Sequence, residues 1–213
     1  SKAYMDKTSV IYIVGSSTMV GERLSTELSE RGYNNTVNRD NFEVDPRNKE
    51  ALANLFSIKK PEYVFLSAGK SGGIQANLNY PADLMIDNLL IACNVIEVAQ
   101  EYGIKRLLYL SSSCTYPKHC RQPMQPNMLM TGNLEETNES YAIAKLSGMQ
   151  LCKAYRRQYG SDFISVVPAN TFGPGDDFGE NNSHVISSLI GKIHKAKMIG
   201  SESVNIWGTG TPK

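Results

Sequence analysis

The sequence predicts an α/β fold of the doubly wound class, in which helices cover both faces of a parallel sheet. Short apolar runs alternate at least five times with segments of helical periodicity. The apolar runs are nearly continuous, as is typical of strands buried between two helical layers. The chain has 213 residues, enough for one full domain and part of a second.

Each element has a local signal, taken in chain order. The first strand is a β-branched run that stops at Gly15, and the helix after it ends at Gly32, a residue typical of the position just past a helix C-terminus. Pro81 suits the first position of the third helix. Three prolines within 117–126 predict a long loop before the fourth helix. We predict strands at 8–14, 36–38, 63–68, 107–110 and 163–167, with helices at 20–31, 47–58, 81–102, 140–159 and 183–197.

Composition excludes several classes of function. Twenty-two Lys and Arg against 21 Asp and Glu leave a net charge of +1, which gives no reason to expect nucleic acid or an anionic membrane as a partner. The longest apolar run of note, Val10 to Val14, is far shorter than the roughly 20 residues that span a bilayer. The four cysteines form no Cys-x-x-Cys pair, so we expect no metal site and a reducing, cytoplasmic location.

Gly15 to Gly21 form the first strand-to-helix turn, which predicts a Rossmann-type dinucleotide site. Backbone amides and the positive end of the helix can hold a pyrophosphate there. Gly15 permits a tight turn and Gly21 permits close packing of helix on strand. Thr18 stands where the Gly-x-x-Gly-x-x-Gly pattern has its middle glycine, so its side chain must point aside or shift the cofactor. A plain loop that closes a βα unit is the alternative.

Arg39 and Asp40 follow the second predicted strand, where this fold places the adenosine ribose. An acidic residue there accepts hydrogen bonds from the ribose of NAD, whereas an arginine accommodates the 2′-phosphate of NADP. Because Arg39 comes first, the sequence favours NADP(H). A solvent-exposed arginine that binds no ligand is the alternative.

Tyr141 and Lys145 lie four residues apart on one face of a predicted helix. A tyrosine, with an ordinary pKa of about 10, exchanges a proton near neutral pH only if a nearby cation stabilises the phenolate. The strand before this helix ends in 111–117, at the carboxyl edge where open α/β sheets bind ligands. Position therefore favours a catalytic pair over a chance spacing.

A strand-end serine with a downstream Tyr-x-x-x-Lys resembles the extended short-chain dehydrogenase/reductases. Several stretches are similar to one branch of that family, the GDP-L-fucose synthases, in order and over essentially the whole chain. They are SGGIQANLNYPADLMIDNLLI (71–91), SSSCTYPK (111–118), ESYAIAK (139–145), PANTFGP (168–174), NNSHVI (181–186) and WGTGTP (207–212). The resemblance implies a homodimer that uses NADPH to epimerise and reduce GDP-4-keto-6-deoxy-D-mannose to GDP-L-fucose.

The resemblance also implies roles for particular residues. Tyr141 protonates the C4 oxygen, Lys145 lowers the tyrosine pKa and holds the nicotinamide ribose, and Ser112 hydrogen-bonds the same oxygen. Cys114 and His184 match the epimerisation pair, as base and acid. The implied substrate contacts are Asn170, His184, Lys192 and Trp207. The implied cofactor contacts are Gly15, Ser17, Thr18, Met19, Val20, Gly21, Arg39, Ala68, Gly69, Lys70, Tyr141, Lys145, Pro168 and Asn170.

The chain departs from the family pattern at Thr18, at Ser17, where the family commonly has a second basic contact to the NADP phosphate, and at Lys192, where it usually has arginine. We expect an NADP-binding Rossmann domain with the catalytic residues over 1–170. Residues 171–213 are expected to begin a substrate lobe that is incomplete relative to the family. Two alternatives stay open: a related NDP-deoxysugar epimerase/reductase, and a truncated, non-catalytic dinucleotide-binding module.

Overall fold

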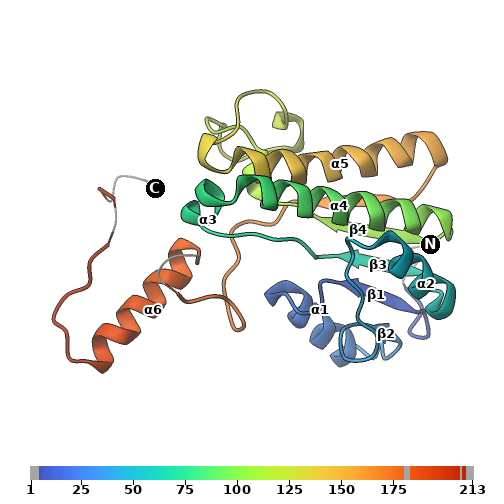
Figure 1. Cartoon of the computed structure of the whole chain (residues 1–213), viewed down its shortest axis with the longest axis horizontal. Coiled ribbons are helices and arrows are strands. Elements are labelled where there is room, and N and C mark those ends of the chain that lie inside the picture. The colour runs from blue at the N-terminus through green and yellow to red at the C-terminus, as the bar shows by residue number, and fades with distance from the viewer. Residues whose placement is uncertain (1–4, 180–182, 207, 210–213) are drawn as a thin grey trace.

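A single sheet of five parallel strands forms the centre of the computed structural model, which describes residues 5–179, 183–206 and 208–209. The strand order is β2-β1-β3-β4-β5, and all four neighbouring pairs are parallel (Figure 1). The predicted α/β class with a parallel sheet is confirmed. The strands are β1 (Ile11–Val14), β2 (Thr36–Val37), β3 (Tyr63–Leu66), β4 (Arg106–Leu110) and β5 (Phe163–Val166).

The helices lie close to the predicted ranges, with one addition. They are α1 (Met19–Glu30), α2 (Lys49–Lys59), α3 (Ile74–Asn79), α4 (Pro81–Glu101), α5 (Glu139–Tyr159) and α6 (Val185–Met198). The short helix α3 was not predicted from the sequence. A local polar contact holds it, because the Asn77 side chain donates hydrogen bonds to the carbonyls of Gly72 and Gly73. Helices were predicted from the spacing of apolar residues, and a contact of this kind produces no such pattern in the sequence.

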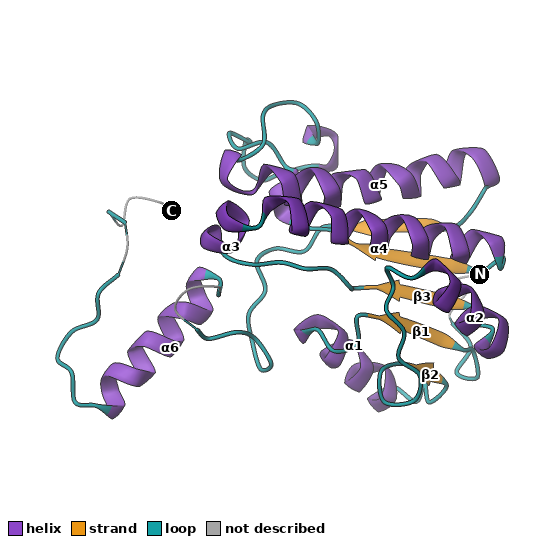
Figure 2. Ribbon diagram, in the orientation of Figure 1, coloured by secondary structure: helices purple, strands orange, loops and turns teal. Residues whose placement is uncertain are grey.

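The main hydrophobic core lies on one face of the sheet, beneath α2, α4 and α5 (Figure 2). Phe56 of α2 is fully buried there and packs edge-on against Tyr12 of β1, with ring centroids 5.8 Å apart. On the opposite face α1 covers β1, where Leu28 packs with Ile11 and Ile13. No described helix is long and apolar enough to cross a membrane. All four cysteines are free thiols, and the cytoplasmic location stays a prediction.

The burial of β3, β4 and β5 differs from the expectation of strands buried on both faces. Along β3 and β4 the side chains alternate between buried and more exposed, because the helices α4 and α5 cover only one face of these strands. On the other face Leu108 and Leu110 are half-buried, and Val166 of β5 is 37% exposed. Helix α1 therefore covers only part of its face of the sheet.

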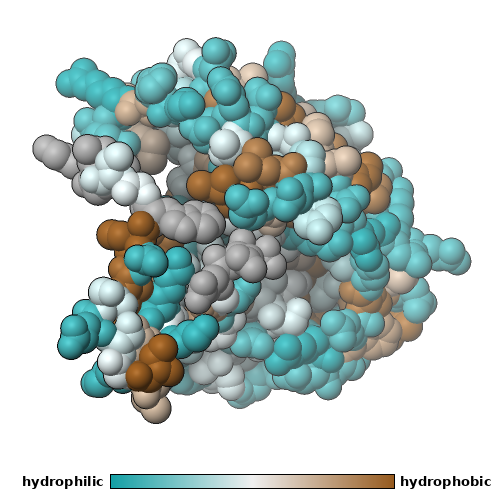
Figure 3. All heavy atoms as spheres, turned by 60° about the vertical axis from the view of Figure 1, so that its left-hand side comes forward, coloured by the Kyte–Doolittle hydropathy of each residue, from teal (hydrophilic) through white to brown (hydrophobic). Residues whose placement is uncertain are grey.

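The connection from β5 to α6 links the start of α1 to the last helix. The backbone of Gly175 passes beside Met19 and Glu22, and the next residue, Asp176, accepts a hydrogen bond from the buried hydroxyl of Ser187 in α6. Helix α6 lies on the side to which the strands point their carboxyl ends (Figure 1). Hydrophobic side chains are exposed on this side of the molecule, and those of α6 include Val185, Ile193 and Met198 (Figure 3).

Candidate active site

The turn between β1 and α1 is built so tightly that two of its positions admit only glycine. Gly15 has a φ of +85°, and a Cβ atom there would lie 2.5 Å from the backbone of Ala68, which follows β3. A Cβ at Gly21 would collide with the carbonyl oxygen of Gly15. The turn, the start of α1 and the end of β3 therefore pack backbone against backbone, as a close-approaching pyrophosphate requires.

The Thr18 side chain closes this turn with hydrogen bonds and does not occupy the space where a pyrophosphate would bind. As the N-cap of α1, its Oγ1 donates a hydrogen bond to the Gly15 carbonyl (2.7 Å) and accepts one from the Gly21 N–H (3.1 Å). The side chain thus points aside, the first of the two possibilities left open by the sequence. The N–H groups of Met19 and Val20 lie in the first turn of α1, where no helical carbonyl stands four residues before them, so they are available to an anion at the positive end of the helix.

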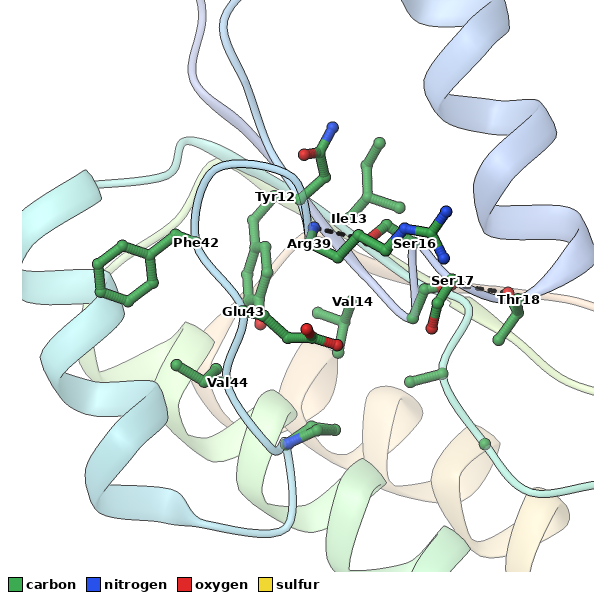
Figure 4. A pocket seen from close by; sticks show the side chains of 15 residues that line it. Tyr12, Ile13, Val14, Ser16, Ser17, Thr18, Arg39, Phe42, Glu43 and Val44 are labelled. Atoms are coloured by element: carbon green, nitrogen blue, oxygen red, sulfur yellow. Dashed lines mark hydrogen bonds between the residues drawn. The ribbon is translucent and has the colours of Figure 1, made fainter.

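A cleft of about 190 Å³ runs from this turn to the segment after β2 (Figure 4). Arg39 lines it, and its backbone N–H donates a hydrogen bond of 2.9 Å to the Ser16 hydroxyl. The guanidinium reaches toward Ser17 and Thr18, and it forms ion pairs with Glu22 (3.0 Å) and Asp40 (3.5 Å). The predicted cofactor residues that line this cleft come from the loops after β1, β2 and β3, and they are Gly15, Ser17, Thr18, Arg39, Ala68 and Gly69.

Ser112, Cys114 and Tyr141 come together where β4 ends against α5. The Ser112 hydroxyl lies close enough to the side chains of both Tyr141 and Cys114 to lower the pKa of each. The backbone N–H of Cys114 also donates to the Ser112 Oγ at 3.4 Å. The strand-end serine therefore links the two groups that the sequence analysis assigned to reduction and to epimerisation.

Burial dominates the pKa values of this group. It raises the pKa of the Tyr141 phenol well above its usual range and also raises the pKa of the Cys114 thiol, although the Ser112 hydrogen bond and the Lys145 charge oppose the shift of the thiol. Burial lowers the pKa of Lys145 to about 8. The lowering of the Tyr141 pKa by Lys145 stays a prediction.

Lys145 is held in a buried position by β4. Its Nζ donates a hydrogen bond of 2.9 Å to the carbonyl of Leu110 and lies 5.0 Å from the ring centroid of Tyr109. A Cβ at Gly69 would lie 3.3 Å from this Nζ. The lysine therefore stands between the end of β4 and the loop after β3, which carries the predicted residues Ala68, Gly69 and Lys70.

Sequence reasoning missed two polar residues of α4 that border this site, Asp87 and Asn88. Both are buried, although they occupy the helix face that also carries apolar Leu84 and Ile91. That polar interruption of an apolar face was the available signal. The Asp87 carboxylate pairs with Lys70 and, at 2.9 Å, with Arg47, and so ties the loops after β3 and β2 to α4.

The site offers unpaired buried groups to a ligand. Asn88 donates to the carbonyls of Lys70 and Leu84, but its Oδ1 is buried with no hydrogen-bond partner among the described residues, and so is the Oγ of Ser111. The Asn88 Oδ1 lies 2.6 Å from where a Cβ of Gly69 would be. Buried acceptors rarely stay unpaired, so these atoms, with the glycine cradle and Arg39, fit a dinucleotide with ribose hydroxyls and phosphates.

The remaining predicted residues are less tightly grouped. Asn170, after β5, is exposed and accepts a hydrogen bond from Ser113 at 3.4 Å, while Pro168 lies half-buried just before it. His184 is exposed as the N-cap of α6, and no hydrogen bond joins its side chain to Cys114 in the described part of the chain. Lys192 lies on α6, and Trp207 lies outside the described residues.

Comparisons with known proteins place these residues in a known context. Residues 11–213 match the NAD dependent epimerase/dehydratase family. The chain is 46% identical over 207 residues to GDP-L-fucose synthase 1 of Arabidopsis thaliana, covering 97% of this chain but 64% of that protein. Among solved structures, a GDP-6-OMe-4-keto-L-xylo-heptose reductase from C. jejuni is 36% identical with a TM-score of 0.85, over 92% of this chain and 56% of that one. A GDP-L-fucose synthetase from Naegleria fowleri bound to NADP is 25% identical with a TM-score of 0.85, over 99% and 69%.

The first prediction concerns the hydroxyl that closes the turn. Thr18→Val keeps the shape of the side chain but loses both hydrogen bonds, so the free energy of unfolding should fall by about 1–2 kcal/mol. Urea unfolding measures it. Thr26→Val, on an exposed position of the same helix, is the matched control and should change stability by no more than about 0.5 kcal/mol. Equal losses of unfolding free energy in the two variants would show that the hydrogen bonds of Thr18 stabilise the turn no more than an exposed threonine of the same helix stabilises α1.

The second prediction concerns Lys145, whose pKa of about 8 lies below the ordinary 10.5. Between these values the unfolded state binds more protons than the folded state, so the contribution of Lys145 to stability rises with pH. The difference in unfolding free energy between wild type and Lys145→Met should increase by roughly 3 kcal/mol from pH 8 to 10.5. Lys153→Met, at an exposed position of α5, should give a difference that is flat with pH. A flat profile for Lys145→Met would contradict the lowered pKa.

Proposed function

Because the chain belongs to the NAD dependent epimerase/dehydratase family, we propose that it epimerises and reduces a GDP-linked 4-keto sugar with NADPH. We further propose GDP-4-keto-6-deoxy-D-mannose as the substrate and GDP-L-fucose as the product. The observation that carries the proposal is the contact of Ser112 with both Tyr141 and Cys114 beside a buried Lys145. The chain spans 64% of the length of the Arabidopsis synthase, whose similarity supports the substrate class.

For the reduction, NADPH supplies the hydride when bound. The Gly15–Gly21 turn would hold its pyrophosphate, Arg39 its 2′-phosphate, and Lys145 its nicotinamide ribose. Tyr141 would donate its proton to the C4 oxygen, since a buried phenol with a raised pKa is fully protonated at neutral pH. The Ser112 hydroxyl, close to Tyr141, would donate to the same oxygen and orient the ketone.

For the epimerisation, Cys114 would take a proton from each carbon next to the ketone, and His184 would return one on the opposite face. The carbons are acidic because the ketone stabilises the resulting carbanion, and the Ser112 and Tyr141 hydroxyls would hydrogen-bond its oxygen. Burial raises the Cys114 pKa, so the thiolate depends on the Lys145 charge and the Ser112 hydrogen bond that oppose this shift. His184, at the start of α6, would approach from the substrate lobe.

A second candidate is reduction without epimerisation. The raised pKa of Cys114 and the similarity to a GDP-heptose reductase favour it. Turnover in D₂O distinguishes the two, because epimerisation exchanges the hydrogens at C3 and C5 with solvent whereas reduction alone does not. Deuterium at both carbons of the product favours the first candidate, and its absence favours the second.

We also assign residues 1–170 to a cofactor domain with the catalytic residues and 171–213 to the start of a substrate lobe. The path of the chain supports this division, since Gly175 and Asp176 lead from the start of α1 to α6. Limited proteolysis in the presence of NADPH tests it. Protection of the first part together with cleavage within 171–184 is expected, and early cleavage within β1 to β5 would contradict it.

The third prediction concerns turnover. Tyr141→Phe should lower the rate of NADPH oxidation with GDP-4-keto-6-deoxy-D-mannose by at least about 100-fold, because the proton donor is lost, while NADPH binding persists. Tyr159→Phe, on an exposed position of α5, should keep the wild-type rate. Equal rates in wild type and Tyr141→Phe would sink the proposal. Wild type that binds NADPH without turning over any GDP-keto sugar would favour the non-catalytic module.

The fourth prediction concerns a homodimer, which we propose to form through α4 and α5. Ile86, Leu90 and Cys93 are exposed at helical spacing on α4, and Ile143 is 38% exposed on α5. Such an apolar stripe is typical of a helix–helix interface. Sedimentation velocity should give a species of twice 23.5 kDa that Leu90→Glu converts to the monomer. A wild-type monomer at micromolar concentration would contradict the proposal.

A further inference from the structure

Arg39 already has two acidic partners. Its Nη2 lies 3.0 Å from Glu22 Oε1 and its Nε lies 3.5 Å from Asp40 Oδ1. Arg39 is the one cation among the described residues that line the cleft, and Glu43 lines the same cleft. A 2′-phosphate that binds Arg39 must therefore displace or share its carboxylate partners.

The two acidic partners differ in how exposed and how tightly packed their side chains are. The Asp40 side chain is 80% exposed, whereas that of Glu22 is 44% exposed. Glu22 lies in the first turn of α1, where its backbone N–H donates to the Thr18 carbonyl at 2.8 Å. Its other carboxylate oxygen lies 3.3 Å from where a Cβ of Gly175 would be. Glu22 is thus packed between Arg39 and the β5–α6 connection.

Charge makes this arrangement selective. A phosphate monoester carries a charge of about −1.5 to −2 at neutral pH, so a fixed carboxylate repels it and competes with it for Arg39. The 2′-hydroxyl of NAD is neutral and can donate a hydrogen bond to a carboxylate. Ser17, beside the guanidinium in Figure 4, adds no positive charge that would offset Glu22.

We propose that Glu22 is a specificity residue of the cofactor site: its carboxylate competes with the 2′-phosphate of NADP(H) for Arg39 and so weakens the preference for NADP(H) over NAD(H). The proposal rests on the proposed function, because it concerns the cofactor of the same site. It predicts that the wild-type chain also binds NADH, and that removing one negative charge strengthens NADPH binding selectively.

The fifth prediction compares the Kd values of NADPH and NADH, measured from the fluorescence of the reduced nicotinamide, in wild type and Glu22→Gln. The substitution should shift the ratio of the two Kd values roughly tenfold toward NADPH at low salt, a Coulomb effect of one charge at close range, and less at high salt. Glu30→Gln, at the exposed far end of α1, is the matched control and should not shift the ratio. Circular dichroism melting verifies that each variant is folded.

A double substitution tests the mechanism. If Glu22 competes for Arg39, Glu22→Gln should have a smaller effect in an Arg39→Met background than in wild type. A shift of the ratio below about threefold, or an equal shift in both backgrounds, would overturn the proposal for Glu22 and leave the proposed function standing. Wild type that binds neither dinucleotide would overturn the proposed function itself, and the Glu22 proposal with it.

Discussion

The close packing of the β1–α1 turn against the end of β3 is the constraint on which the site depends. Gly15 reaches the backbone of Ala68 only because it lacks a side chain, and Gly21 brings α1 onto the same turn. The Thr18 hydroxyl then ties the two glycines together through Gly15 O and the Gly21 N–H. A tight turn therefore needs no glycine at its middle position when the residue there caps the helix. This packing sets the direction of α1, and with it the position of Glu22 beside Arg39.

Burial fixes the position of the catalytic group and sets its pKa values. Helices α4 and α5 press against each other and against the sheet, so Lys145 lies in the interior, with Leu110 O as its acceptor. The same burial raises the pKa of Tyr141 and Cys114, which keeps both groups protonated and neutral at pH 7, and lowers the pKa of Lys145 to about 8, close enough to neutrality for its charge to respond to a ligand. Anionic cofactor and substrate groups would favour the charged form of Lys145. The proposed chemistry therefore couples cofactor binding to the protonation of the site.

Features that depend on chain order could be predicted from the sequence, whereas most features that depend on side-chain direction could not. The parallel sheet, the glycine turn and the meeting of Ser112 with Tyr141 all result from strands whose carboxyl ends share one edge. The direction of the Thr18 side chain, the Leu110 acceptor of Lys145 and the Glu22 partner of Arg39 could not be predicted, because each depends on atoms brought together from separate elements. The half-covered face of β4 and β5 was also missed, since an apolar run does not reveal how many helices pack on it.

The most direct test of cofactor binding at the glycine turn is hydrogen–deuterium exchange of this chain with and without NADPH. We expect slower exchange in peptides that contain Met19 and Val20, whose N–H groups would gain the pyrophosphate as acceptor, and in the peptide that contains Arg39. The exposed second half of α6 should exchange at the same rate in both samples. Unchanged exchange over 15–22 at saturating NADPH would contradict the claim that this turn binds the cofactor.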